Sequence, residues 1–361
     1  MRVKAILLLS LFLAASGGVA GDFAEVSARA AAALEAEKLP EALQLYRQAL
    51  GLKPDWEEGW WFTGIISYNS GQYAEGRQAF SKLIALNQNS AAGLAFLGLC
   101  EFETGAYESA LDHIERSLKL SGGPPEVRDV LLYREALLLT RERKWDEART
   151  VYRTFVQKGV HDPPLIAGIG INALERPLLP SEVQPDQREL VMMTGTAVWF
   201  WMSGDAAKTT SALQDLLTRF PSSPGVHYLY GTWLLSSNLQ GPGMAELKKE
   251  LELNPANASA GSFLALAILP DKPSEALTIA KAAAASPNPG ARVLYVYGLA
   301  LSKTGSLAEA ARQLEAAERL DSKNLGVHIA LAGIYSQTGR NDEARQERIT
   351  SIALAKSNEA H

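Results

Sequence analysis

One ten-residue phrase returns along this chain at a spacing of 34 residues. It reads GQYAEGRQAF from Gly71 and GAYESALDHI from Gly105, and it returns as GSLAEAARQL from Gly305 and GRNDEARQER from Gly339. A fixed period of this length is typical of arrays in which one small structural unit stacks on the next. The 361-residue chain is therefore predicted to be a repeat protein, and this class favours a binding scaffold over an enzyme.

Each unit has the spacing of two amphipathic helices. Apolar residues recur at steps of three and four through residues 91–104 and again from Tyr107 to Ile114, which places them on one face of each helix. Gly105 stands between the two stripes. A chain leaving a helix commonly needs a left-handed residue, which costs glycine nothing. We therefore expect a helix-turn-helix unit.

The segment from Glu57 carries the fullest version of the pattern. The matching residues are Trp60, Gly64, Gly71, Tyr73, Gly76, Phe80 and Leu86. They resemble the tetratricopeptide repeat family, whose unit has 34 residues. The resemblance implies an all-α, right-handed superhelical solenoid of about nine helix-turn-helix units. Units are expected to start near Phe23, Glu57, Ala91, Asp129, Leu190, Pro224, Ala258, Ala291 and Leu325.

A proline-rich stretch interrupts the period between Gly159 and Leu190. Prolines at this density break helices because they remove N–H donors and restrict the residue before them. We expect an N-terminal block of about four units over 21–158, an irregular insert over 159–189 and a C-terminal block of about five units over 190–361. The apolar run from Leu165 is expected to form a short irregular helix. The insert either joins the blocks or folds over a groove as part of a binding site.

The N-terminus has the pattern of a secretory signal peptide over residues 1–20. Arg2 and Lys4 precede an apolar run, and small residues end at Ala20. The run is too short for the roughly 20 residues of a membrane-spanning helix. Cleavage would move the formal net charge from −5 to about −7. The chain is therefore expected to be exported, to a periplasm or outside the cell, with no stable membrane span.

Signatures of catalysis and of cofactor or metal binding are lacking. Cys100 lies in the apolar stripe of a helix, where a buried, inert thiol is expected. Gly168 and Gly170 lack the other elements of a dinucleotide motif, so a locally flexible or closely packed helix is the better interpretation. The net negative charge disfavours nucleic acid. The histidines form no paired metal motif, and packed roles are expected for two of them, His227 and His328.

The family resemblance also implies a concave groove lined by the first helix of each unit. Its inward positions carry many apolar and aromatic side chains, which suit an apolar or amphipathic protein segment. The lysine, asparagine and arginine side chains with which some family members hold a carboxylate are missing from these positions. The predicted groove residues are Trp61, Ile65, Tyr68, Leu99, Phe102, Tyr133, Leu137, Val198, Trp201, Tyr228, Tyr295 and Leu299.

We therefore predict an exported scaffold for protein–protein interaction, active in bacterial envelope assembly or secretion. One alternative is an enzyme-associated subunit with a site near the insert, involving Cys100 or His161. Another alternative is a structural component that assembles with copies of itself. The polar closing segment from Asp342 to Leu354 suits a solvated cap and argues against open-ended stacking.

Overall fold

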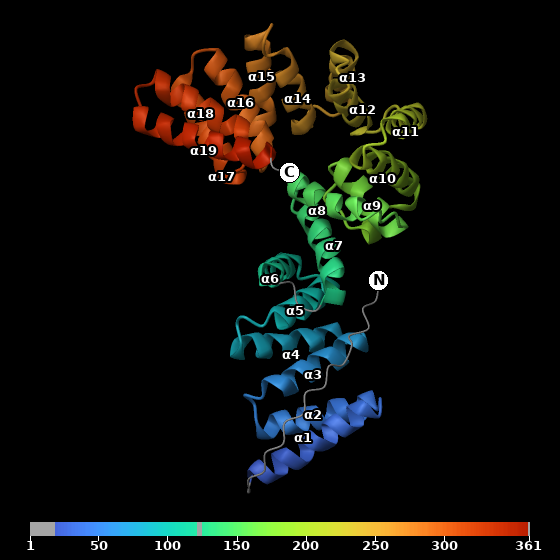
Figure 1. Ribbon diagram of the computed structural model, residues 1–361. Coiled ribbons are helices and arrows are strands. Elements are labelled where there is room, and N and C mark those ends of the chain that lie inside the picture. Colours follow the sequence, from blue (N-terminus) through green and yellow to red (C-terminus); the bar gives the residue numbers. More distant parts are fainter. Residues whose placement is uncertain (1–18, 121–124, 360–361) are drawn as a thin grey trace. The chain divides into compact units, whose positions relative to one another are not determined.

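A computed structural model describes residues 19–120 and 125–359 (Figure 1). Every regular element in these residues is helical, with nineteen α-helices and two short 3₁₀ helices. The predicted all-α solenoid of helix pairs is therefore confirmed. The chain divides into two compact units. One holds the described residues up to Glu142 with Thr150–Tyr152, and the other holds Arg143–Arg149 with the chain from Arg153 onward.

The first unit contains seven helices in its described residues. Each of the first three odd-numbered helices packs on the helix that follows it, and α4 also packs on α5. The helices are α1 (Val19–Glu35), α2 (Leu39–Leu52), α3 (Glu57–Asn69), α4 (Tyr73–Leu86), α5 (Ala91–Glu103), α6 (Tyr107–Lys119) and α7 (Pro125–Arg141).

The second unit continues the same pairwise packing. Its first helix, α8 (Trp145–Gln157), contributes residues to both units. After α9 (Pro163–Ala173) come the 3₁₀ helices η1 (Pro180–Glu182) and η2 (Pro185–Gln187). The remaining helices are α10 (Arg188–Ser203), α11 (Ala206–Arg219), α12 (Val226–Ser236), α13 (Gln240–Leu253), α14 (Ala258–Ile268), α15 (Pro273–Ala284), α16 (Ala291–Lys303), α17 (Leu307–Leu320), α18 (Leu325–Gln337) and α19 (Asn341–Glu359).

All nine expected units correspond to helix pairs. First helices begin at Glu57, Ala91, Ala258, Ala291 and Leu325, as the repeat register predicts. Small side chains on the second helices, among them Ala42, Ala110 and Ala310, are fully buried where the paired helices approach closely. The core is thus distributed along the array.

Left-handed residues make the turns inside the pairs. Gly71, Gly105 and Gly305 have φ angles of +74°, +79° and +87°. Glu37 and Arg143 take the same place in their own pairs, with φ of 56° and 62°. The repeated phrase begins with glycine because glycine adopts this conformation without the steric cost that a Cβ brings.

The insert contains half of a repeat. Helix α9 is regular rather than irregular, because Pro163 and Pro164 fall in its first turn, where a missing N–H is tolerated and the Asp162 side chain caps Leu165. Glu175 follows with a φ of 52°, as at the end of a first helix. The two 3₁₀ helices then replace a second helix, and α9 packs on α10. The limits of the predicted blocks stay a prediction.

The predicted signal peptide lies outside the described residues, apart from Val19 and Ala20 at the start of α1. Across the residues that the structure describes, we find no helix with both the length and the apolar character needed to cross a bilayer.

Candidate protein-binding surface

First helices of successive pairs contact one another. In the first unit α5 touches both α3 and α7, and in the second unit α14 touches both α12 and α16. Each unit therefore has a row of first helices, and the predicted groove residues lie on the helices of these two rows.

In the first unit, neighbouring parts of the chain cover most of α5, the middle helix of this row. Helix α5 is buried from Gly93 to Phe102, so it is covered on every side, as expected of a helix that is apolar all round. The Arg134 guanidinium lies 4.2 Å from the centroid of the Phe102 ring and covers it. Four of the predicted groove side chains of this unit are buried: Ile65, Leu99, Phe102 and Leu137.

The other predicted groove side chains of the first unit are half-buried: Trp61, Tyr68 and Tyr133. Trp61 and Tyr68 both meet the buried Phe96 edge-on, with ring centroids 5.6 and 5.3 Å away. These contacts fix both rings against α5 while part of each stays in solvent.

In the second unit, Val198 and Tyr228 are buried, whereas Trp201, Tyr295 and Leu299 are half-buried. Trp201 on α10 meets Trp233 on α12 edge-to-face, with centroids 5.4 Å apart and ring planes at 76°. The Trp233 indole N–H donates to Thr210 Oγ1 at 3.0 Å. Trp233 is half-buried, and the repeat register did not select it because it lies between two inward positions.

Further apolar side chains line one side of α10. Met192, Met193, Thr196, Trp199 and Phe200 follow one another at helical spacing, and all are half-buried; we call them the α10 apolar face. The Trp199 indole N–H donates to the Val160 carbonyl at 2.8 Å, which fixes its ring. The apolar periodicity of residues 192–200 could have predicted this face. The family register instead predicted Val198 and Trp201 as the groove residues of α10.

A polar cluster surrounds the buried Tyr228. It contains Arg149 from α8, Glu175 from the insert and Ser259 from α14. Burial raises the pKa of Glu175 to about 7, against the opposing influence of Ser259 and Arg149. Burial also raises the pKa of Tyr228 to about 12. Glu175 Oε1 is buried and has no hydrogen-bond partner among the described residues. The insert therefore reaches the row of first helices.

A buried carboxylate organises the start of α12. Glu250 on α13 accepts hydrogen bonds from the backbone N–H of Gly225 at 2.8 and 2.9 Å and of Tyr228 at 3.3 Å. The Asn257 side-chain amide donates to it at 3.0 Å. These donors satisfy a side chain that has no exposed surface. No local sequence pattern marks Glu250, because its partners lie in other helices and turns.

The expected packed roles of the cysteine and two histidines are confirmed. Cys100 is fully buried, and burial raises the pKa of its thiol to about 12, so the thiolate needed for nucleophilic attack is disfavoured. His227 and His328 are 7% and 2% exposed, and both ring nitrogens of each have hydrogen-bond partners. The closely packed interpretation of Gly170 is confirmed as well: a Cβ there would lie 2.0 Å from the Val191 carbonyl oxygen.

Comparison with protein families identifies two matching stretches. Residues 63–125 and 301–347 each match a model described as tetratricopeptide repeat. No curated protein matches the chain.

Solved structures show similar helical arrays. A MamA chain from Desulfovibrio magneticus RS-1 is 19% identical, with a TM-score of 0.39, over 47% of this chain and 96% of MamA. Yeast Tom70 is 13% identical, with a TM-score of 0.34, over 92% of each chain. The Cut9–Hcn1 hetero-tetramer of the APC/C gives 12% identity and a TM-score of 0.37, over 92% of this chain and 79% of the matched one.

Proposed function

Because the chain is a tetratricopeptide repeat protein, and so a helical scaffold for binding other proteins, we propose that it holds an apolar or amphipathic protein segment. The observation that carries this proposal is the Trp201–Trp233 pair, whose two half-buried rings meet edge to face. The two rings form the anchor of the proposed site.

Aromatic side chains suit such a role. Tryptophan offers a large apolar area with few rotatable bonds, and it is enriched among residues that dominate binding energy. A hydrogen bond from the Trp233 indole to Thr210 holds this ring before a partner arrives, which lowers the ordering cost of binding.

Peptide selection tests this proposal. Peptides of about 15 residues, enough for four helical turns, would be selected on the immobilised chain, and their Kd measured by fluorescence anisotropy. We expect apolar residues at helical spacing in the selected peptides. Trp201→Ala with Trp233→Ala should weaken binding roughly 30-fold, the effect of about 2 kcal/mol.

Trp60→Ala is the matched control, because Trp60 is also half-buried and hydrogen-bonded, to the Pro54 carbonyl, but lies in the first unit. It should leave the Kd unchanged. Selected peptides without apolar spacing, or an equal loss in the Trp60→Ala variant, would contradict the proposal.

We further propose export and a role in bacterial envelope assembly or secretion. The support is the pattern of residues 1–20, with two cations, an apolar run and small residues before Gly21. N-terminal sequencing of the protein from fractionated cells tests this part. A chain that begins near Gly21 and lies outside the cytoplasm is expected, and a chain that retains Met1 in the cytoplasm would refute it.

We propose no catalytic role. The buried thiol of Cys100 is a poor nucleophile. His161 stacks edge-on against Trp199, with centroids 4.7 Å apart, which gives it a packing role.

A further inference from the structure

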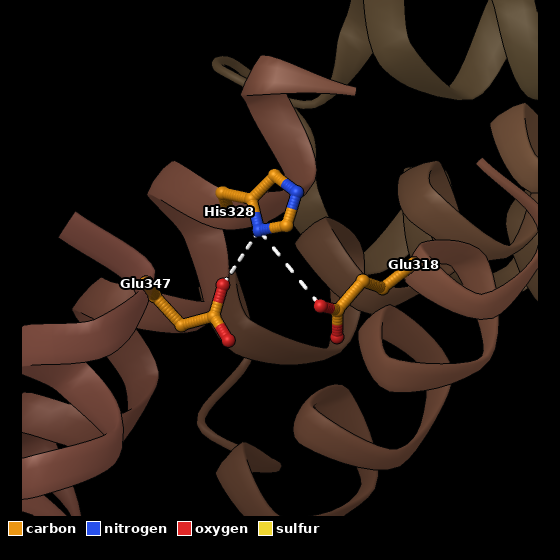
Figure 2. Close-up of side chains that lie close together, drawn as sticks. All are labelled: Glu318, His328 and Glu347. Carbon is orange, nitrogen blue, oxygen red and sulfur yellow. Dashed lines mark hydrogen bonds and ion pairs between the residues drawn. The ribbon is translucent and has the colours of Figure 1, made fainter. Parts of the chain in front are cut away.

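A buried histidine and two glutamates converge between α17, α18 and α19 (Figure 2). His328 Nδ1 lies 2.6 Å from Glu347 Oε2 and 3.9 Å from Glu318 Oε1. The three donor atoms all lie within 4.8 Å of one another. Figure 2 shows both carboxyl groups directed at the same edge of the imidazole ring. Small side-chain rotations would bring all three atoms onto one ion.

A hydrogen bond on the far side of the His328 ring determines which ring nitrogen can offer a lone pair to a ligand. His328 Nε2 lies 2.9 Å from the Ser322 carbonyl oxygen, which can only accept, so Nε2 carries a proton. Once the proton that Nδ1 shares with Glu347 is removed, the lone pair of the neutral ring is on Nδ1, facing the two carboxylates. Metal-binding histidines almost always donate their other N–H to a carbonyl or carboxylate in this way, which fixes the tautomer and the ring orientation.

His227 provides an internal comparison. Its Nδ1 contacts Glu246, 19 residues later, and its Nε2 contacts the Pro221 carbonyl, six residues earlier, the same offsets as at His328. There, however, the Lys249 ammonium lies 2.8 Å from the carboxylate. At His328 the additional neighbour is the Glu318 carboxylate instead of a lysine. The charge next to the ring is thus reversed between two otherwise equivalent sites.

Further charges face the His328 site. Glu315 adds negative potential, and Arg319 is the cation that opposes it at Glu318. The ligand oxygens of Glu318 and Glu347 lie within 4.8 Å of each other. Two carboxylates close to each other repel, and a divalent cation would remove that repulsion.

We propose that Glu318, His328 and Glu347 bind a divalent transition-metal ion of the zinc type. One imidazole nitrogen and two carboxylate oxygens are ligands that Zn²⁺ accepts, and water would complete a tetrahedron. Binding displaces any proton on His328 Nδ1 into solvent. The ion would tie the last helix, α19, to α17 and α18. The proposal is independent of the peptide-binding surface.

Metal titration of the tag-free, chelator-treated chain tests the site. We expect one equivalent of Zn²⁺ by calorimetry, a rise in Tm with Zn²⁺, and visible absorption typical of tetrahedral Co²⁺. Glu318→Gln should weaken Zn²⁺ binding by at least about tenfold. Glu318 is 33% exposed, so this change is not expected to disturb the fold, and circular dichroism would check that.

Glu246→Gln is the control, because it alters the carboxylate at His227 that corresponds to Glu347. It should bind Zn²⁺ as the unaltered chain does. Absence of one-equivalent binding to the unaltered chain would overturn the proposal. So would equal binding by the Glu318→Gln variant, or an equal loss in both variants.

Discussion

Gly170 and Gly195 lie where the backbones of α9 and α10 touch. A Cβ on Gly170 would stand 2.0 Å from the Val191 carbonyl oxygen, and one on Gly195 would stand 1.9 Å from the Ile166 carbonyl oxygen. Real Cβ atoms do not approach that closely, so the two helices would have to separate to admit even a methyl group. The half repeat is therefore held to α10 by direct contact of main chains.

Gly170→Ala should destabilise the second unit. Overpacking of this kind costs about 1–3 kcal/mol of unfolding free energy, which urea denaturation would measure. Gly333→Ala is the control, because Gly333 on α18 has no atom within 4 Å of its added Cβ. That change should be neutral or stabilise by up to about 1 kcal/mol. Equal effects of the two changes would contradict the close contact.

Glu250→Gln should also destabilise the second unit. The substitution replaces a carboxylate oxygen with an amide NH₂ among donors from Gly225, Tyr228 and Asn257, and it leaves at least one buried N–H without an acceptor. A loss of about 1.5–3 kcal/mol is expected in urea denaturation. Glu252→Gln, at an exposed position of the same helix, should change stability by less than about 0.5 kcal/mol.

Glu175 should make stability depend on pH near neutrality. Its folded pKa is about 7, above the ordinary value of 4.5, so the folded chain holds the protonated form more tightly than the unfolded chain does. Stability should therefore fall as pH rises from about 4.5 to 7 and remain lower above that.

Glu175→Gln should remove this pH dependence of stability. The variant should gain stability relative to the unaltered chain, roughly 3 kcal/mol at pH 8 and none at pH 4. Thermal denaturation across this range measures the difference. A gain that does not vary with pH would show that Glu175 does not titrate as expected.

Cys100 should react only when the first unit opens. Its sulfur is fully buried, and its thiol pKa is about 12, so little thiolate exists at pH 8. Iodoacetamide should leave the native chain unmodified for hours and alkylate it quickly in urea, as mass spectrometry would show. Rapid alkylation of the native chain would mean that α5 is exposed.

The 34-residue period was sufficient to predict the fold. It located helix starts as far apart as Glu57 and Leu325, because a turn with a left-handed residue, in several units a glycine, recurs between the paired helices. The insert was harder to predict. Its prolines suggested irregular structure, but proline disrupts a helix only beyond the first turn, and Pro163 and Pro164 lie within it.

The binding surface was less predictable, because exposure depends on which neighbour covers a helix. Leu99 occupies an inward position in the repeat register, yet α5 is covered on all sides. Trp233 and Glu175 gain their surroundings from segments distant in sequence. The Glu318, His328 and Glu347 cluster was hard to predict for the same reason, since its members come from three helices and form no short motif.

The pairwise packing of helices also bears on how the chain acquires its structure. Within each unit the principal contacts join a helix to the next helix or the one after it. Few long loops must close before a contact forms, and chains of low contact order fold quickly. Helices α1 to α4 can therefore assemble while later residues are still being synthesised. An exporter that requires an unfolded chain would have to capture this protein early, before its first pairs close.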